Sequence, residues 1–178
     1  PPIFLSTTFE EQEPAVTYGY DYARAGNPTR DSFEKCVASL EEAKYGIATA
    51  SGLAALTTLT HVLSAGDHVV VCDDVYGGVN RYFSKVSSNF NLEISLVDMT
   101  NTDNLRKAIK SNTKMVWLET PTNPTLKLID IQAVASVAHE TEGMLVVVDN
   151  TFLSPYFQQP LKLGADVVLH SVTKYING

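Results

Sequence analysis

The stretch MLVVVD, residues 144–149, decides how this chain folds. Its three valines, 146–148, are consecutive, so a strand through this stretch carries apolar side chains on both faces. A strand of that kind is buried on both sides, which is typical of a parallel sheet covered by helices. We therefore expect MLVVVD to be a strand inside a parallel sheet, with Asp149 at its carboxyl end.

Similar β-rich runs recur along the chain, and helical patterns separate them. The predicted strands are YGIATA (45–50), HVVVC (68–72), LEISLV (92–97), KMVWLE (114–119), MLVVVD (144–149) and DVVLHS (166–171). The predicted helices begin at residue 29 and recur at about 51–64, 77–89, 102–111 and 130–141. Strands that alternate with helices in this way predict an α/β fold, with a mostly parallel sheet and helices on both faces.

Polar side chains mark where several of these helices begin. Asn27 followed by Pro28 is a capping residue followed by a proline in the first helical turn. Thr102 and Asp130 are predicted N-caps of two later helices. The apolar positions of the first helix follow helical spacing and are Phe33, Cys36, Val37 and Leu40.

The N-terminal segment lacks such a pattern. Residues 1–28 show no apolar periodicity, so we expect an extended N-terminal arm there and a ligand-binding domain over residues 29–178. The chain opens on PPIFLSTTFE and stops four residues after Lys174, and both ends resemble the interior of a protein. We therefore expect a piece of a longer chain, in which the large domain is incomplete and a C-terminal domain is absent.

The composition excludes some classes of partner. Thirteen basic and twenty acidic residues give a net charge of −7, and no Lys/Arg block occurs. This argues against nucleic acid and anionic membrane surfaces, which require clustered positive charge. No apolar run approaches the roughly 18 residues of a membrane span, and the opening has no signal-peptide layout. Cys36 and Cys72 are predicted to be buried free thiols, which favours a reducing compartment, the cytoplasm.

Ligands of parallel α/β sheets bind beyond the carboxyl ends of the strands, so the residues there are the candidate site. After the first strand, Ser51-Gly52-Leu53 opens a helix, where an anion site and a simple serine cap are both compatible with the sequence. After the second, Tyr76 is followed by two glycines and then Arg81; the tyrosine either stacks on a planar ligand or packs in a turn.

The remaining strand ends carry further polar residues. Glu119 and Asn123 lie in a loop with two prolines, which is explained equally well by a site and by a structural loop. Asp149 ends a very apolar strand, where a carboxylate is costly to bury unless a positive group meets it; bracing of the loop is the alternative. Lys174 follows the last strand and is either an ordinary surface lysine or an amine able to bond a carbonyl carbon covalently.

Taken together, these groups match the requirements of one cofactor. Pyridoxal phosphate needs a lysine for its aldehyde, a carboxylate for its ring nitrogen, N–H and O–H donors for its phosphate and a flat side chain for its ring. A metal site is not predicted, because the four histidines are scattered without ligand spacing.

The chain resembles the Cys/Met-metabolism family of pyridoxal-phosphate enzymes, which have the type I fold with an aspartate-aminotransferase-like large domain. The segments that carry the resemblance span nearly the whole chain in the family's order: YDYARAGNPTR, ATASGLAA, DDVYGGVNRYF, WLETPTNPTLKLIDI, VVVDNTFLSPYFQQPLKLGAD and HSVTKYING. Val172 departs from the family, since a small residue is common at this position.

The resemblance implies a role for each candidate residue. Lys174 would form the Schiff base and carry protons, Asp149 would pair with the ring nitrogen, and Tyr76 would stack on the ring. The residues that would bind the phosphate are Gly52, Leu53, Ser171 and Thr173. Those that would contact the substrate are Asn123, Arg81 and Glu119. Tyr22 and Arg24 would reach the phosphate of a neighbouring subunit, so a homo-oligomer is expected, with a tetramer as the favoured form.

The resemblance also implies an activity. Within the family, the motifs are most similar to the eukaryotic branch that eliminates at Cγ of L-cystathionine, which yields L-cysteine, 2-oxobutanoate and ammonia. Replacement at Cγ and elimination at Cβ remain alternatives on the same scaffold, because their determinants lie partly outside this chain. A paralogue that keeps the fold without catalysis is a further alternative.

Overall fold

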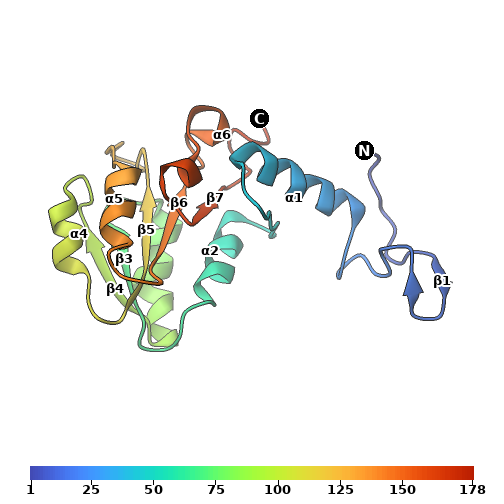
Figure 1. The fold of residues 1–178 in the computed structure, drawn as a ribbon, viewed down its shortest axis with the longest axis horizontal. Helices are drawn as coiled ribbons and strands as arrows, with labels where there is room; N and C mark the ends of the chain where they lie inside the picture. Colours follow the sequence, from blue (N-terminus) through green and yellow to red (C-terminus); the bar gives the residue numbers. More distant parts are fainter. The chain divides into compact units, whose positions relative to one another are not determined.

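The computed structural model describes all residues from 1 to 178. Its internal contacts form two compact units, Pro1–Ala48 and Thr49–Gly178. The first unit comprises the predicted arm, residues 1–28, and the first helix; Figure 1 shows both in blue.

The first unit contains a short hairpin and one helix. The hairpin pairs β1 (Glu11–Glu13) with β2 (Val16–Thr17) in antiparallel orientation, and the sequence pattern does not predict it. The helix, α1 (Pro28–Glu41), begins as predicted, because the Asn27 side chain accepts hydrogen bonds from the N–H groups of Thr29 and Arg30.

The prediction that Cys36 is buried was wrong. Cys36 is a free thiol on the exposed surface of α1, and Phe33 and Leu40, from the same apolar stripe, are exposed as well. Helical spacing shows which side chains share a face, but it does not show whether a second layer covers that face. Cys72, in contrast, is a buried free thiol as predicted.

The second unit is built on a five-stranded parallel sheet with the order β4-β3-β5-β6-β7. Its strands are β3 (His68–Cys72), β4 (Glu93–Val97), β5 (Thr113–Glu119), β6 (Leu145–Asp149) and β7 (Val167–Leu169). All five were predicted. The valines of β6 are completely buried, so the strand is covered on both faces as its apolar run indicated.

The helices lie on both faces of this sheet. They are α2 (Gly52–Thr60), α3 (Gly77–Arg81), α4 (Thr102–Ala108), α5 (Ile131–Ala138) and α6 (Ser154–Phe157), with a π-helical turn η1 (Tyr82–Val86) and 3₁₀ turns η2 (Ser87–Phe90) and η3 (Pro160–Leu163). α2 contacts α3, whereas α4 contacts α5 and α5 contacts η3 (Figure 1). The chain passes from β3 to β4 in one direction across the sheet, and from β4 through β5 and β6 to β7 in the other. Because such crossovers are right-handed, the helices of the first connection lie on one face and those of the later connections lie on the opposite face.

Two local predictions differ from the structure. YGIATA (45–50) is not a strand: no neighbouring strand pairs with it, although its composition favours one. The N-cap of α4 is Asn101, which accepts from the N–H of Asp103, and Thr102 is the first helical residue. The cap at Asp130 is confirmed, since its side chain accepts from the N–H of Ala133.

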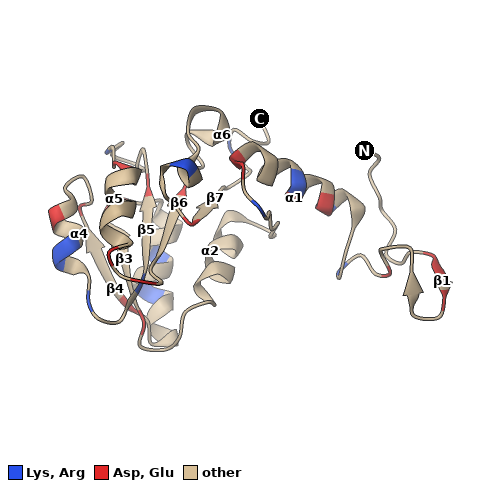
Figure 2. Cartoon of the chain, viewed as in Figure 1, with Lys and Arg blue, Asp and Glu red and all other residues tan.

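Charged side chains are spread over the surface. Figure 2 shows Lys and Arg scattered along the helices and loops, with one adjacent pair, Arg106 and Lys107, on α4. The strongest local grouping is Lys127, whose ammonium group lies 2.8 Å from Asp73 and 3.3 Å from Asp98. None of the helices is both long and apolar enough to cross a membrane.

The packing of β5 gives a direct test of the core. Leu118 is completely buried there, so Leu118→Ala should destabilise the full-length protein by about 2–5 kcal/mol, because it removes apolar contacts and leaves a cavity. Leu118→Met, which conserves volume, should cost less than about 1.5 kcal/mol. Urea unfolding followed by circular dichroism measures both values, and equal losses would contradict the packing of this strand.

Candidate active site

The strand order reverses between β3 and β5, and the region beyond the carboxyl ends of these two strands is called the crevice below. The chain leaves β3 towards α3 on one face and leaves β5 towards α5 on the other. Such a reversal of strand order is where parallel α/β sheets bind ligands, beyond the carboxyl ends of the strands. The loop after β3 carries Tyr76 and the loop after β5 carries Asn123, so both side chains belong to this edge.

The ring of Tyr76 is available to a ligand. Tyr76 immediately precedes α3, and 54% of its surface is exposed. The ring lies against Gly78, where an added Cβ would come within 2.5 Å of it. Glycine at this position therefore allows a flat, exposed aromatic face at the edge of the sheet, as stacking on a planar ligand requires.

Asp149 supplies a buried negative charge at the same edge. It ends β6 and is only 8% exposed, and its burial raises the pKa of the carboxyl group. The hydroxyl and the N–H of Thr151 both donate to its Oδ1, at 2.5 and 3.0 Å, and act in the opposite direction on the pKa. No lysine or arginine forms an ion pair with it. A positively charged ligand nitrogen fits this environment, because it would stabilise the carboxylate.

A cradle for an anion lies at the beginning of α2. Ser51 caps this helix, because its Oγ accepts from the N–H of Ala54 at 3.0 Å. The prediction that Ser51 is a helix cap is therefore confirmed. The helix start nevertheless faces hydroxyl groups: a Cβ on Gly52 would lie 3.0 Å from the Cβ of Ser171, and Ser171 Oγ is 2.7 Å from Thr173 Oγ1. N–H groups, a helix N-terminus and two hydroxyls fit a phosphate group.

Thr151 joins the two parts of the site, and sequence reasoning missed it. Its Oγ1 donates to Asp149 and accepts from the N–H of Ser171 at 2.8 Å. The carboxylate and the phosphate cradle are thereby held at a fixed spacing. The sequence signal was available in Asp149-Asn150-Thr151, since a hydroxyl two residues after an aspartate commonly bonds to it.

The lysine and the remaining candidates are placed as follows. Lys174 is exposed in the turn after β7, and its N–H contacts the carbonyl of Ser171 at 3.4 Å. Arg81 is exposed at the end of α3. Glu119 is 5% exposed, and its carboxylate accepts from the N–H of Tyr76 at 3.0 Å. Leu53 is exposed in the first turn of α2.

Tyr22 and Arg24 belong to the first unit. The Arg24 guanidinium carbon lies 4.8 Å from the centre of the Tyr22 ring. Arg30 holds the surrounding turn, because its guanidinium donates to the carbonyls of Ala23 and Ala25 at 3.1 and 3.2 Å. The segment YAR therefore has a defined local conformation.

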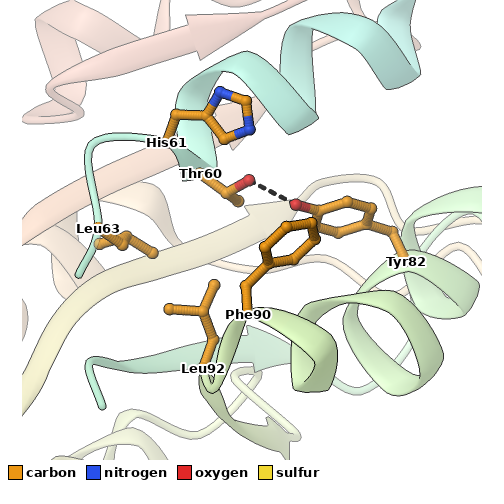
Figure 3. A pocket seen from close by; sticks show the side chains of 6 residues that line it. All are labelled: Thr60, His61, Leu63, Tyr82, Phe90 and Leu92. Atoms are coloured by element: carbon orange, nitrogen blue, oxygen red, sulfur yellow. Dashed lines mark hydrogen bonds between the residues drawn. The ribbon is translucent and has the colours of Figure 1, made fainter. Parts of the chain in front are cut away.

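A cavity of about 360 Å³ lies elsewhere, at the opposite end of α2 (Figure 3). It contains a buried hydroxyl pair, in which Thr60 Oγ1 and the Tyr82 hydroxyl are 2.6 Å apart. Its lining is formed by Thr60, His61, Leu63, Tyr82, Phe90 and Leu92. It contains none of the candidate residues.

Comparisons with known proteins identify the family of this chain. The sequence profile described as "Cys/Met metabolism PLP-dependent enzyme" matches residues 1–178. Cystathionine gamma-lyase of Dictyostelium discoideum is 58% identical over 99% of this chain and 46% of its own length. The human cystathionine gamma-lyase is 56% identical over 100% of this chain and 44% of its own length. The chain thus spans slightly less than half the length of these relatives.

Solved structures are similar as well. The crystal structure of metB from Corynebacterium glutamicum has a TM-score of 0.97 and 50% identity, and the match covers 100% of this chain and 46% of that one. Cystathionine gamma-lyase from Lactobacillus plantarum, in complex with L-serine, has a TM-score of 0.95 and 44% identity over 99% of this chain and 46% of that one. Because the family profile matches all 178 residues of this chain, the chain belongs to the Cys/Met-metabolism family of PLP-dependent enzymes.

Proposed function

We propose that the carboxyl edge of this sheet holds pyridoxal phosphate in the full-length protein. Asp149 would face the ring nitrogen, Tyr76 would cover the ring, and Lys174 would hold the cofactor covalently. The phosphate would lie at the residues of the cradle, namely Gly52, Leu53, Ser171 and Thr173. The observation that carries this proposal is the connection, through Thr151, of a buried carboxylate without a lysine or arginine partner to a cradle of donors.

The chain's own residues then divide the work of the reaction. The cofactor, when bound, supplies an electron sink for the electrons released at the substrate Cα. Asp149 keeps a proton on the ring nitrogen, because a buried carboxylate is stabilised by an adjacent positive charge. The Nζ atom of Lys174 takes the proton from the substrate Cα and can return it to a neighbouring carbon. Tyr76 restricts the ring to one orientation and shields that side from water.

We further propose γ-elimination of L-cystathionine, with L-cysteine, 2-oxobutanoate and ammonia as products. The cystathionine gamma-lyases that are 56–58% identical to this chain over the matched 178 residues support this choice. Asn123 and Arg81, from the loops beside the crevice, would contact the substrate. The alternatives on the same scaffold, replacement at Cγ and elimination at Cβ, differ in their products.

The proposal extends to the assembly and the location of the protein. Tyr22 and Arg24 would reach the phosphate of a neighbouring subunit, which makes the site depend on a homo-oligomer, with a tetramer as the proposed form. The rest of the large domain and a C-terminal domain would lie outside this chain, which spans slightly less than half the length of its relatives. The cytoplasm is the proposed compartment, because an exposed free thiol such as Cys36 is maintained under reducing conditions.

Lys174→Ala should abolish covalent attachment of the cofactor. In the full-length wild-type protein, borohydride reduction should fix the cofactor on the peptide that contains Lys174, with loss of the visible absorbance band. The variant should show neither the band nor a labelled peptide. Lys114→Ala, at an exposed position of β5, should behave like the wild type. A labelled peptide from the Lys174→Ala protein would refute this assignment.

Asp149→Asn should separate cofactor binding from catalysis. The amide keeps the shape of the side chain but lacks the charge that holds a proton on the ring nitrogen, so kcat should fall by on the order of 10²–10³. Absorbance should show that the cofactor still occupies the protein. Asp103→Asn, on the exposed first turn of α4, is the matched control. An unchanged kcat in the Asp149→Asn enzyme would rule out this role.

The keto acid formed from L-cystathionine tests the reaction itself. Full-length enzyme should release 2-oxobutanoate together with L-cysteine, because the bond from Cγ to sulfur breaks. Chromatography of the derivatised keto acids distinguishes the outcomes. Pyruvate would instead indicate elimination at Cβ, and the absence of any keto acid in a cofactor-loaded protein would favour the non-catalytic alternative.

A further inference from the structure

The carboxylate of Glu119 connects the two loops of the crevice. Glu119 is the last residue of β5, and its Oε2 accepts from the N–H of Tyr76, in the loop after β3, at 3.0 Å. The backbone N–H of Asn123, in the loop after its own strand, also faces this carboxylate and acts to lower its pKa. One buried side chain thus faces the backbone of both residues that are proposed to face the cofactor and the substrate.

Asp74 forms the reciprocal connection. It lies in the loop after β3, and its Oδ2 accepts from Thr122 Oγ1 at 2.5 Å and from the N–H of Thr125 at 3.0 Å, as well as from the Thr125 hydroxyl. These bonds, together with Lys127, hold the pKa of the Asp74 carboxyl below its usual value despite its partial burial. Asp74 is therefore a charged anchor on the outer side of the same crevice.

The backbone does not make this connection by itself. The regular pairing of β3 with β5 ends at Val71 and Trp117, and the N–H of Glu119 contacts the sulfur of Cys72 at 3.4 Å. Beyond this point the two loops turn towards helices on opposite faces of the sheet. Beyond the paired residues, the side-chain carboxylates of Glu119 and Asp74 therefore connect the two loops in place of backbone hydrogen bonds between the strands.

We propose that Glu119 is a positioning residue of the cofactor site: its carboxylate fixes Tyr76 and Asn123 relative to each other and thereby sets how tightly the cofactor is held. The proposal rests on the function proposed above, because it assumes that Tyr76 covers the cofactor ring. It assigns Glu119 to the support of the site, in place of the direct contact with substrate that the sequence suggested.

The charges around Glu119 make this support dependent on pH. Burial raises the pKa of Glu119 to about 7, the negative charges of Asp149 and Asp74 add to the rise, and the N–H groups of Tyr76 and Asn123 oppose it. No basic residue forms an ion pair with it.

The other titratable groups near Glu119, Asp149 and Asp74 come from β3, from the loop after it and from the segment after β7. The Cys72 thiol of β3 is uncharged near neutral pH, since burial raises its pKa to about 12. Asp73 precedes Asp74 and pairs with Lys127. His170, after β7, acts on Asp149 and lowers its pKa.

The direction of the pH effect follows from the hydrogen bonds. A carboxylate accepts N–H bonds more strongly than a neutral carboxyl group does, by roughly a factor of two in energy. Above its pKa, Glu119 should hold both loops firmly, and below it the hold should weaken. Cofactor binding should therefore tighten through Glu119 as the pH rises past neutrality.

The test compares the full-length wild-type protein with Glu119→Gln, which keeps the shape of the side chain but cannot titrate. Dissociation constants for pyridoxal phosphate are measured on the cofactor-free proteins. At about pH 8.5 the variant should bind about tenfold more weakly, and at about pH 5.5 the two constants should approach each other. The ratio of the two dissociation constants is compared at each pH, because protonation of the cofactor itself affects both proteins equally and cancels in the ratio. Glu93→Gln, on exposed β4, should match the wild type at every pH.

Hydrogen exchange provides a readout that does not require cofactor. In the wild-type protein, the amides of Tyr76 and Asn123 should lose protection about tenfold, after correction for the intrinsic rate, as the pH falls from about 8.5 to about 5.5. The amides of β6, residues 145–149, should not. This measurement remains decisive if the variant fails to fold.

The outcomes separate the two proposals. If the wild-type protein binds no pyridoxal phosphate, the proposed function fails. If the wild type binds it, a ratio that stays near one, or equal protection of the two amides across this pH range, overturns the role of Glu119. A ratio that differs from one but does not change with pH overturns it as well, because a purely steric effect would produce that result.

Discussion

Two carboxylates end neighbouring strands in register, and the site depends on how their charges are balanced. Glu119 of β5 pairs with Asp149 of β6; both are buried, and neither forms an ion pair with a lysine or an arginine. Desolvation raises the pKa of each, and the negative charge of Asp149 adds to the rise at Glu119. Such an arrangement favours a ligand that brings positive charge to this edge.

The buried core of the sheet offsets the free-energy cost of burying these two carboxylates. Consecutive valines in β3 and β6 and the side chains around Trp117 are completely buried, and Phe83 packs against Trp117 with its ring centre 5.7 Å away. Because the core lies between two helical layers, polar groups can be concentrated at one edge without disrupting it. The reversal of strand order between β3 and β5 then separates the loops, and the carboxylates of Asp74 and Glu119 reconnect them.

Sequence patterns were sufficient for the parallel strands and for most helix starts, because burial on two faces and side-chain capping are local properties. They failed where the outcome depends on a neighbour. YGIATA (45–50) has the composition of a strand but no paired partner, and Cys36 has helical spacing but no covering layer. At α4 the neighbouring residues Asn101 and Thr102 are both good caps, and the backbone of Asn101, which is extended, settles the choice.

The site shows the same division. By itself the sequence determined the kinds of group at the strand ends, namely the aromatic ring of Tyr76, the carboxylate of Asp149, the hydroxyls of Ser171 and Thr173 and the amine of Lys174, and their order matched one family. Only the tertiary structure decided that Thr151 joins carboxylate and cradle and that Glu119 faces two backbone amides. The physical reason is that these bonds link residues between 20 and 43 positions apart, whose meeting is set by the order of strands in the sheet and not by their own sequence.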